Sequence, residues 1–314
     1  MQGFFHELIG LAKPPGGLLV GPLSLIWADD SIETKPAPGC TLSGFGPPGD
    51  VVGRTGRDRD RDLHWVLRCG VWNGAHTHQD RNALTLSAFG ERLLIDSGRT
   101  HACFSPPMTT WHKPTLGHNA ILIGGTGQHG SNEAPSHGRI LRADSLDGRH
   151  TVVGDAKDCY RAASTALRAV HAADGMLAVF DLIEAAATSF TCLWRVDDRD
   201  GALRCEHGDG IWRFVRPRAS LVIVPVLPPD RTRAYRGWID HQEDASSCLD
   251  CERSTGRFLH LLIPLHPGEA LGVELAPGAV RLDLRGRSRS LALLPSGTGF
   301  VADGITVDLA TYLG

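Results

Sequence analysis

The sequence has little lysine and no long apolar run, and each shortage excludes a class of protein. Only four of the 32 basic residues are lysines, and 35 acidic residues outweigh them, so the chain lacks the basic surplus that nucleic-acid binding requires. Glycine and proline interrupt the longest apolar runs, which are too short to span a membrane. With 314 residues, 42% of them hydrophobic and 21% charged, the chain is expected to fold as a globular protein.

Helical periodicity is also scarce after residue 60. Thirty-seven glycines and 19 prolines supply frequent turn signals, and short β-branched or alternating segments recur between them, for example 83–89 and 176–183. Gly90 lies between two such segments and predicts a hairpin tip. Many short strands are typical of a sandwich or barrel. We therefore predict an all-β domain over residues 61–314, preceded by an irregular segment, 1–60, with room for a short helix.

Cysteines and the N-terminus say little about location. The eight cysteines lack the density of a disulfide framework, and Cys248 and Cys251 form a single C-x-x-C that is interpreted as ordinary thiols or a local bridge. The first residues lack a basic region followed by an uninterrupted apolar run, so no signal peptide is recognised. The sequence by itself leaves the compartment open, a cytoplasmic location included.

Histidine is in surplus, and its distribution is uneven. Nine of the 15 histidines fall between residues 64 and 150. His76, His78 and Asp80 stand at every second position, and on an extended chain such side chains share one face. Two imidazoles and a carboxylate form a common ligand set for zinc or another late first-row metal. A polar strand face turned to solvent is the alternative.

Three known patterns share this opening. The metallo-β-lactamase pattern H-x-H-x-D-H fits His76, His78 and Asp80, but Arg81 replaces its last histidine. The cupin pattern fits Gly70 and the two histidines, but the glutamate that should follow is missing. A cupin-like metalloenzyme that uses both histidines as ligands is kept as an alternative.

The third pattern covers more of the chain. The segment HTHQD is followed by an alternating stretch, by LLIDSG ending at Gly98, and by the dipeptide His118-Asn119 before an apolar segment. This ordered set resembles the C-terminal β-sandwich domain of the heparinase II/III-like polysaccharide lyases, and residues 160–195 resemble the continuation of that sandwich. The resemblance implies an antiparallel β-sandwich of the supersandwich type.

The resemblance also implies roles for single residues. His78, Asp96 and His118 are expected to hold a structural zinc ion, and His76 is expected to belong to a lyase active site. A hairpin tip near Gly90 would place Asp96 far from His78 along the strands, so the site requires that the histidine segment curl back or that a bulge shift the register.

Three further residues are expected to support this site. Asp80 is expected to orient a ligating imidazole rather than to bind the metal itself. Arg99 is a candidate partner for a substrate carboxylate, and Trp111 is a candidate stacking surface for a pyranose ring.

The family resemblance implies a substrate, a reaction and a location. The substrate class is an acidic polysaccharide or oligosaccharide that contains uronic acid, cleaved by β-elimination, and the location is the periplasm or cell envelope. The family's other catalytic groups come from an N-terminal helical toroid, which needs on the order of 200 residues. Only 75 residues precede His76, so the toroid is expected to be absent. Activity is then expected to need a separate helical chain or a homo-oligomer, and a non-catalytic carbohydrate-binding module with a metal-pinned loop is the alternative.

Overall fold

A computed structural model describes residues 41–45, 49–56, 58, 60–72, 74 and 76–313. Within these residues the chain forms three antiparallel sheets and four short helical turns. The helical turns are η1 (Met108–His112), η2 (Thr115–Gly117), η3 (Lys157–Cys159) and η4 (Ala310–Tyr312). None of the helices in this part of the chain is long and apolar enough to cross a membrane.

The first sheet has nine strands in the order β1-β2-β3-β4-β5-β11-β16-β15, and β6 pairs with β11 beside this path. Its strands are β1 (Thr41–Phe45), β2 (Asp50–Arg54), β3 (Leu63–Arg68), β4 (Ala83–Ala88), β5 (Glu91–Leu94), β6 (Ile121–Ile123), β11 (Phe190–Asp197), β15 (Arg231–Ile239) and β16 (Gln242–Arg253). The first two strands lie in the segment that was expected to be irregular, so that expectation is wrong for them. The expected short helix lies outside the described residues.

The second sheet has eight strands in the order β12-β13-β14-β17-β10-β9-β8-β7, and the third has five in sequence order. The strands of the second sheet are β7 (Arg139–Leu146), β8 (Arg149–Asp155), β9 (Ala163–Ala173), β10 (Met176–Ala185), β12 (Arg204–Gly208), β13 (Ile211–Val215), β14 (Ser220–Pro225) and β17 (Arg257–Leu265). Those of the third are β18 (Leu271–Ala276), β19 (Ala279–Leu284), β20 (Arg287–Leu293), β21 (Gly299–Ala302) and β22 (Ile305–Asp308).

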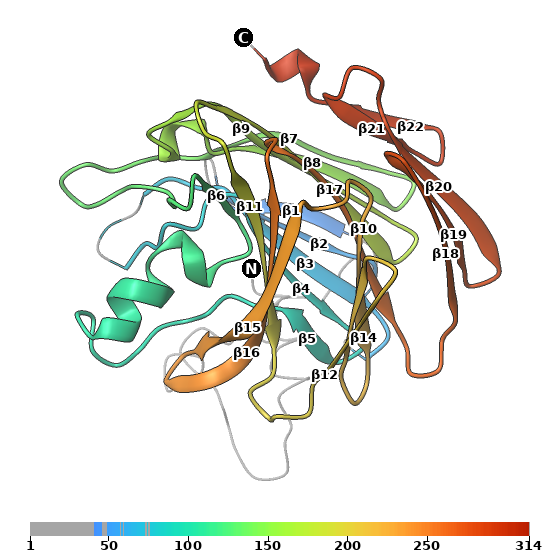
Figure 1. The fold of residues 1–314 in the computed structure, drawn as a ribbon, viewed down its shortest axis with the longest axis horizontal. Helices are drawn as coiled ribbons and strands as arrows, with labels where there is room; N and C mark the ends of the chain where they lie inside the picture. Colours follow the sequence, from blue (N-terminus) through green and yellow to red (C-terminus); the bar gives the residue numbers. More distant parts are fainter. Residues whose placement is uncertain are drawn as a thin grey trace, which may run out of the picture.

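The three sheets stack as layers around two hydrophobic cores. Trp65 and Trp194 from the first sheet pack with Val170 from the second in one core. Phe180 from the second sheet and Phe300 from the third pack in the other, with ring centroids 6.2 Å apart. Figure 1 shows the third sheet, in red, on the opposite side of the molecule from the short helices of the 106–117 region. This stack confirms the predicted all-β antiparallel sandwich.

The hairpin predicted at Gly90 is present between β4 and β5. Phe89 and Gly90 both have positive φ, 55° and 78°, which is the backbone of a tight two-residue hairpin turn. The register shifts between Leu86 and Ser87, which marks a bulge. Because the last pair of this ladder is Leu86 with Leu94, Asp96 follows directly where β5 leaves the sheet.

Candidate functional site

The histidine-rich segment lies in the loop between β3 and β4, residues 69–82, and is not a strand. Two bonds tie it to the η1–η2 segment: the Gln79 amide donates to the Lys113 carbonyl (2.8 Å), and the Thr115 hydroxyl donates to the Gln79 carbonyl (2.8 Å). The expectation that His76, His78 and Asp80 share a strand face is therefore wrong. The segment curls back instead, which is the condition that the spacing of the candidate ligands required.

Arg81 stabilises this loop from inside the protein, where it is only 1% exposed. Its guanidinium donates to the carbonyls of His78 and Gly70, and it pairs with the Asp80 carboxylate (3.3 Å). Its backbone amide donates to the side-chain oxygen of Gln128 (2.8 Å), whose amide group donates back to the Arg81 carbonyl (2.6 Å). A buried cation with these partners fixes the backbone that carries His78.

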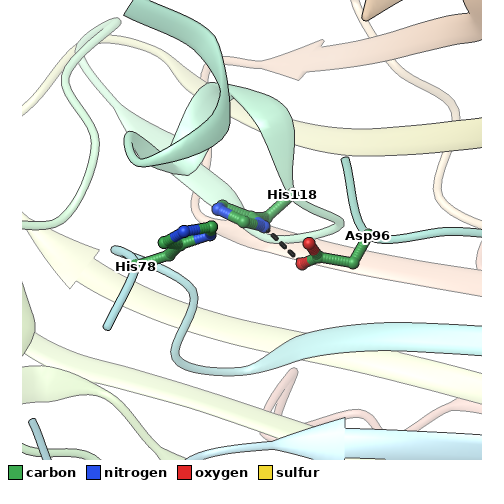
Figure 2. A group of neighbouring side chains, drawn as sticks. All are labelled: His78, Asp96 and His118. Carbon is green, nitrogen blue, oxygen red and sulfur yellow. Dashed lines mark hydrogen bonds and ion pairs between the residues drawn. The ribbon is translucent and has the colours of Figure 1, made fainter. Parts of the chain in front are cut away.

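His78, Asp96 and His118 converge from three separate segments, as Figure 2 shows. One ligand atom from each lies within 4.8 Å of those of the other two. The Asp96 carboxylate and the His118 Nδ1 are 2.7 Å apart, and the two imidazole centroids are 5.4 Å apart. The structure thus brings together the three residues that were predicted as ligands.

Asn119 explains how Asp96 and His118 are brought into contact. Its side-chain amide donates to the carbonyls of Leu84 (2.7 Å) and Ile95 (2.9 Å), and its side-chain oxygen accepts from the Arg195 amide (2.6 Å). One buried side chain thus joins β4, the end of β5 and β11, immediately beside both candidate ligands. In the sequence Asn119 stands out only as part of the His118-Asn119 dipeptide, and its role was not predicted.

The charges of the cluster suit a cation. Desolvation by surrounding protein raises the pKa of Asp96, but the charge and hydrogen bond of His118 outweigh it and lower the pKa to about 2. Desolvation, reinforced by the charge of His118, lowers the pKa of His78 to about 4. At neutral pH the site therefore offers an ionised carboxylate at Asp96 and a neutral imidazole at His78. Burial opposes protonation of His118, but the charge and hydrogen bond of Asp96 raise the pKa of His118, so a bound metal ion would displace a proton from that imidazole.

The donor set fits a zinc-type ion. Nε2 of His118 is buried without a hydrogen-bond partner, while Nδ1 faces Asp96. An imidazole with one nitrogen on a carboxylate and the other unpartnered is the common arrangement of a metal-binding histidine. Asp96 is positioned either to bind the ion itself or to orient His118 toward it, and His78 supplies a second nitrogen.

The other predicted residues have different surroundings. His76 is exposed in a turn that the Thr77 amide closes on the Gly74 carbonyl (3.1 Å). Asp80 is buried, and its carboxylate pairs with Arg68 (2.8 Å) and with the loop arginine rather than with an imidazole. Arg99 is exposed, as a substrate contact would need to be.

Trp111 does not fit its predicted role. It is only 8% exposed, its Nε1 donates to the Trp238 carbonyl (3.0 Å), and the Arg195 guanidinium lies 5.4 Å from its ring centroid. The ring is a packing element between η1 and the first sheet, and its burial contradicts the expected stacking on a sugar.

Cys248 and Cys251 are two free thiols. They lie on opposite faces of β16, since side chains three residues apart on a strand point to opposite sides of the sheet.

Solved structures share this architecture. The crystal structure of heparinase III matches with a TM-score of 0.65 and 13% identity over 81% of this chain and 43% of that one. The crystal structure of the heparan sulfate lyase HepC from Pedobacter heparinus matches with a TM-score of 0.67 and 14% identity over 88% of this chain and 44% of that one. At these identities the likeness shows the fold, and this chain spans less than half the length of either structure. No curated protein sequence matches this chain.

The fold and the motif cluster together define a β-sandwich domain of the kind found in these structures. The family model described as "Heparinase II/III-like, C-terminal" matches residues 54–234, more than half of the chain. The chain therefore belongs to the heparinase II/III-like C-terminal domain family, as its motifs indicated.

Proposed function

We propose that this chain is the β-sandwich part of a lyase that cleaves uronic-acid-containing polysaccharide by β-elimination in the periplasm or cell envelope. The observation that carries the proposal is the convergence of His78, Asp96 and His118 beside an exposed His76, in a chain of this family. The remaining catalytic groups would come from a helical region outside this β-sandwich.

The reaction needs a base for the C5 proton, a cation near the C5 carboxylate and an acid for the leaving O4. His76 is exposed and two residues from His78, so its imidazole is available as the base or as a partner of the carboxylate. The exposed guanidinium of Arg99, three residues after Asp96, is a candidate to pair with a uronate. A zinc ion on the three clustered ligands would fix the histidine loop and add positive charge beside it.

The alternatives differ in what they require of His76. A cupin-like site would use His76 and His78 together, but the described cluster contains Asp96 and His118 with His78 and leaves His76 outside. A non-catalytic binding module would need the clustered ligands only to fix the histidine loop. It requires no base at position 76.

The test combines metal analysis with a product assay. Purified protein, alone and mixed with a helical partner chain, is incubated with acidic polysaccharides, and unsaturated uronate is followed by its ultraviolet absorbance. We expect about one zinc per chain, loss of product with metal retained in His76→Gln, and loss of both in His118→Ala. Loss of metal in His76→Gln would instead support the cupin-like site, and absence of product on every substrate would overturn the lyase proposal.

A further inference from the structure

A cavity lies beside β11, β15 and β16 of the first sheet. It encloses about 570 Å³, and Leu116 of η2 and Leu122 of β6 form its apolar wall. His118, a candidate metal ligand, follows Leu116 by two residues, so the two sites share one structural element. None of the residues assigned to the metal-type site lines this cavity.

The strand register brings the polar lining together. Arg231 lies opposite Glu252 and Arg233 lies opposite Asp250 in the β15–β16 ladder, and Thr191 of β11 faces Glu252 from the other side. These side chains point away from the hydrophobic core, into which the intervening residues of β11 and β16 are packed. The cavity is therefore a built feature of three neighbouring strands.

Charge pairing leaves this lining with one surplus cation. Buried Arg195 donates to the Asp250 carboxylate (2.8 Å) and to the Tyr235 hydroxyl (3.0 Å), and Arg231 pairs with Glu252 (2.7 Å). Within the described part of the chain, Arg233 has no carboxylate partner. Its guanidinium lies over the Tyr235 ring, 4.6 Å from the centroid. The pocket thus presents one available positive charge, held in place by an aromatic face.

We propose that this cavity binds one acidic sugar unit of a glycan, with Arg233 pairing to its carboxylate or sulfate. The volume lies within the range of small-molecule sites. The paired carboxylates and guanidinium groups of the wall, together with the hydroxyl of Thr191, supply both acceptors and donors for sugar hydroxyls, and the two leucines cover an apolar ring face. The choice of a glycan rests on the proposed function, but the pocket uses none of its catalytic residues.

The experiment measures binding by isothermal titration calorimetry on the full chain. The probe is a tetrasaccharide that alternates glucuronic acid and N-acetylglucosamine, and the matched neutral probe is a tetramer of N-acetylglucosamine. The titrations use the His76→Gln protein so that the probe is not cleaved during the measurement, and the Arg233 variants identify the binding that belongs to the cavity. We expect binding of the acidic probe only, at least tenfold weaker in Arg233→Gln, because a hydrogen bond to a charged group is lost.

Two variants separate charge recognition from a general effect. Arg233→Lys keeps the charge and should recover part of the affinity, while Arg204→Gln removes an exposed arginine of the distant strand β12 and should leave it unchanged. Equal binding of the neutral probe, equal binding of inorganic sulfate alone, or an unchanged affinity in Arg233→Gln would each overturn the proposal. A failed lyase assay would leave this binding result intact, so the two failures are distinguishable.

Discussion

His260 is predicted to make the stability of this protein fall steeply in mild acid. The side chain is fully buried, packed against Trp194 and Phe258, with ring centroids 5.4 Å and 6.0 Å away. Both of its ring nitrogens are buried without a hydrogen-bond partner. Burial, reinforced by the positive charges of Arg168 and Arg253, lowers the pKa of His260 to about 3. The imidazole is therefore neutral in the folded state.

The sign and size of the effect follow from proton linkage. The unfolded chain binds a proton near pH 6.5 and the folded chain only near pH 3, so the stability is complete above pH 6.5 and is lost as the pH falls between these values. Lowering the pH from 7 to 5 should cost about 2 kcal/mol at this one residue. His171, whose pKa burial lowers to about 4, adds to the loss in the same direction.

The assay is urea unfolding of wild type and His260→Leu at pH 7 and pH 5. The variant removes two unpaired polar atoms at nearly constant volume, so it should be close to wild type at pH 7 and should lose about 2 kcal/mol less between the two pH values. The control Phe258→Leu should be less stable by about 1–2 kcal/mol at both pH values, with the wild-type pH difference kept. Equal acid losses in His260→Leu and wild type would refute the reasoning.

Two further predictions concern buried groups. Arg168 is fully buried and donates to the Asp181 carboxylate at 2.7 and 3.0 Å. The substitution Arg168→Met should lower the free energy of unfolding by about 3–5 kcal/mol, because it leaves a buried carboxylate unpaired. A loss below about 1 kcal/mol in urea unfolding would contradict this. A Cys40→Ser variant keeps seven thiols, of which Cys103 and Cys205 are exposed and the other five are buried. Only these two should react rapidly with a thiol reagent in the folded protein. Fast reaction of a third thiol would contradict the described burial.

Local patterns in the sequence were enough for the hairpin and for the strands with clear alternation. The positive-φ turn at Gly90 and the segment 176–183 are encoded by residues next to one another, and the structure places a turn and β10 there. Strands β15 and β16 were not predicted. Arg231–Ile239 carries three arginines and Gln242–Arg253 carries a C-x-x-C, so neither shows an apolar repeat along its length. Their pairing partners, far away in sequence, decide their structure.

In the candidate site, too, some features could be predicted from neighbouring residues and others depend on residues far away in sequence. The motif order placed His78, Asp96 and His118 in one set, but the conformation of the histidine loop could not be predicted from its alternating pattern. That loop is fixed by Arg81 and by Gln128, and a buried arginine has no local signature that distinguishes it from a solvated one. Trp111 was assigned to substrate for a related reason, since burial of an aromatic ring depends on distant residues.

Asn119, whose side chain joins β4, the end of β5 and β11, has a consequence for the order in which the molecule folds. The three candidate ligands lie within about forty residues of sequence, yet the bonds that set their geometry reach to Gln128, to Arg168 through the Asn119 carbonyl, and to Arg195. Contacts that close such long loops form slowly compared with a hairpin such as β4–β5. The ligand cluster should therefore be completed late in folding, after β9 and β11 have joined their sheets, and a metal ion would bind to an already built scaffold.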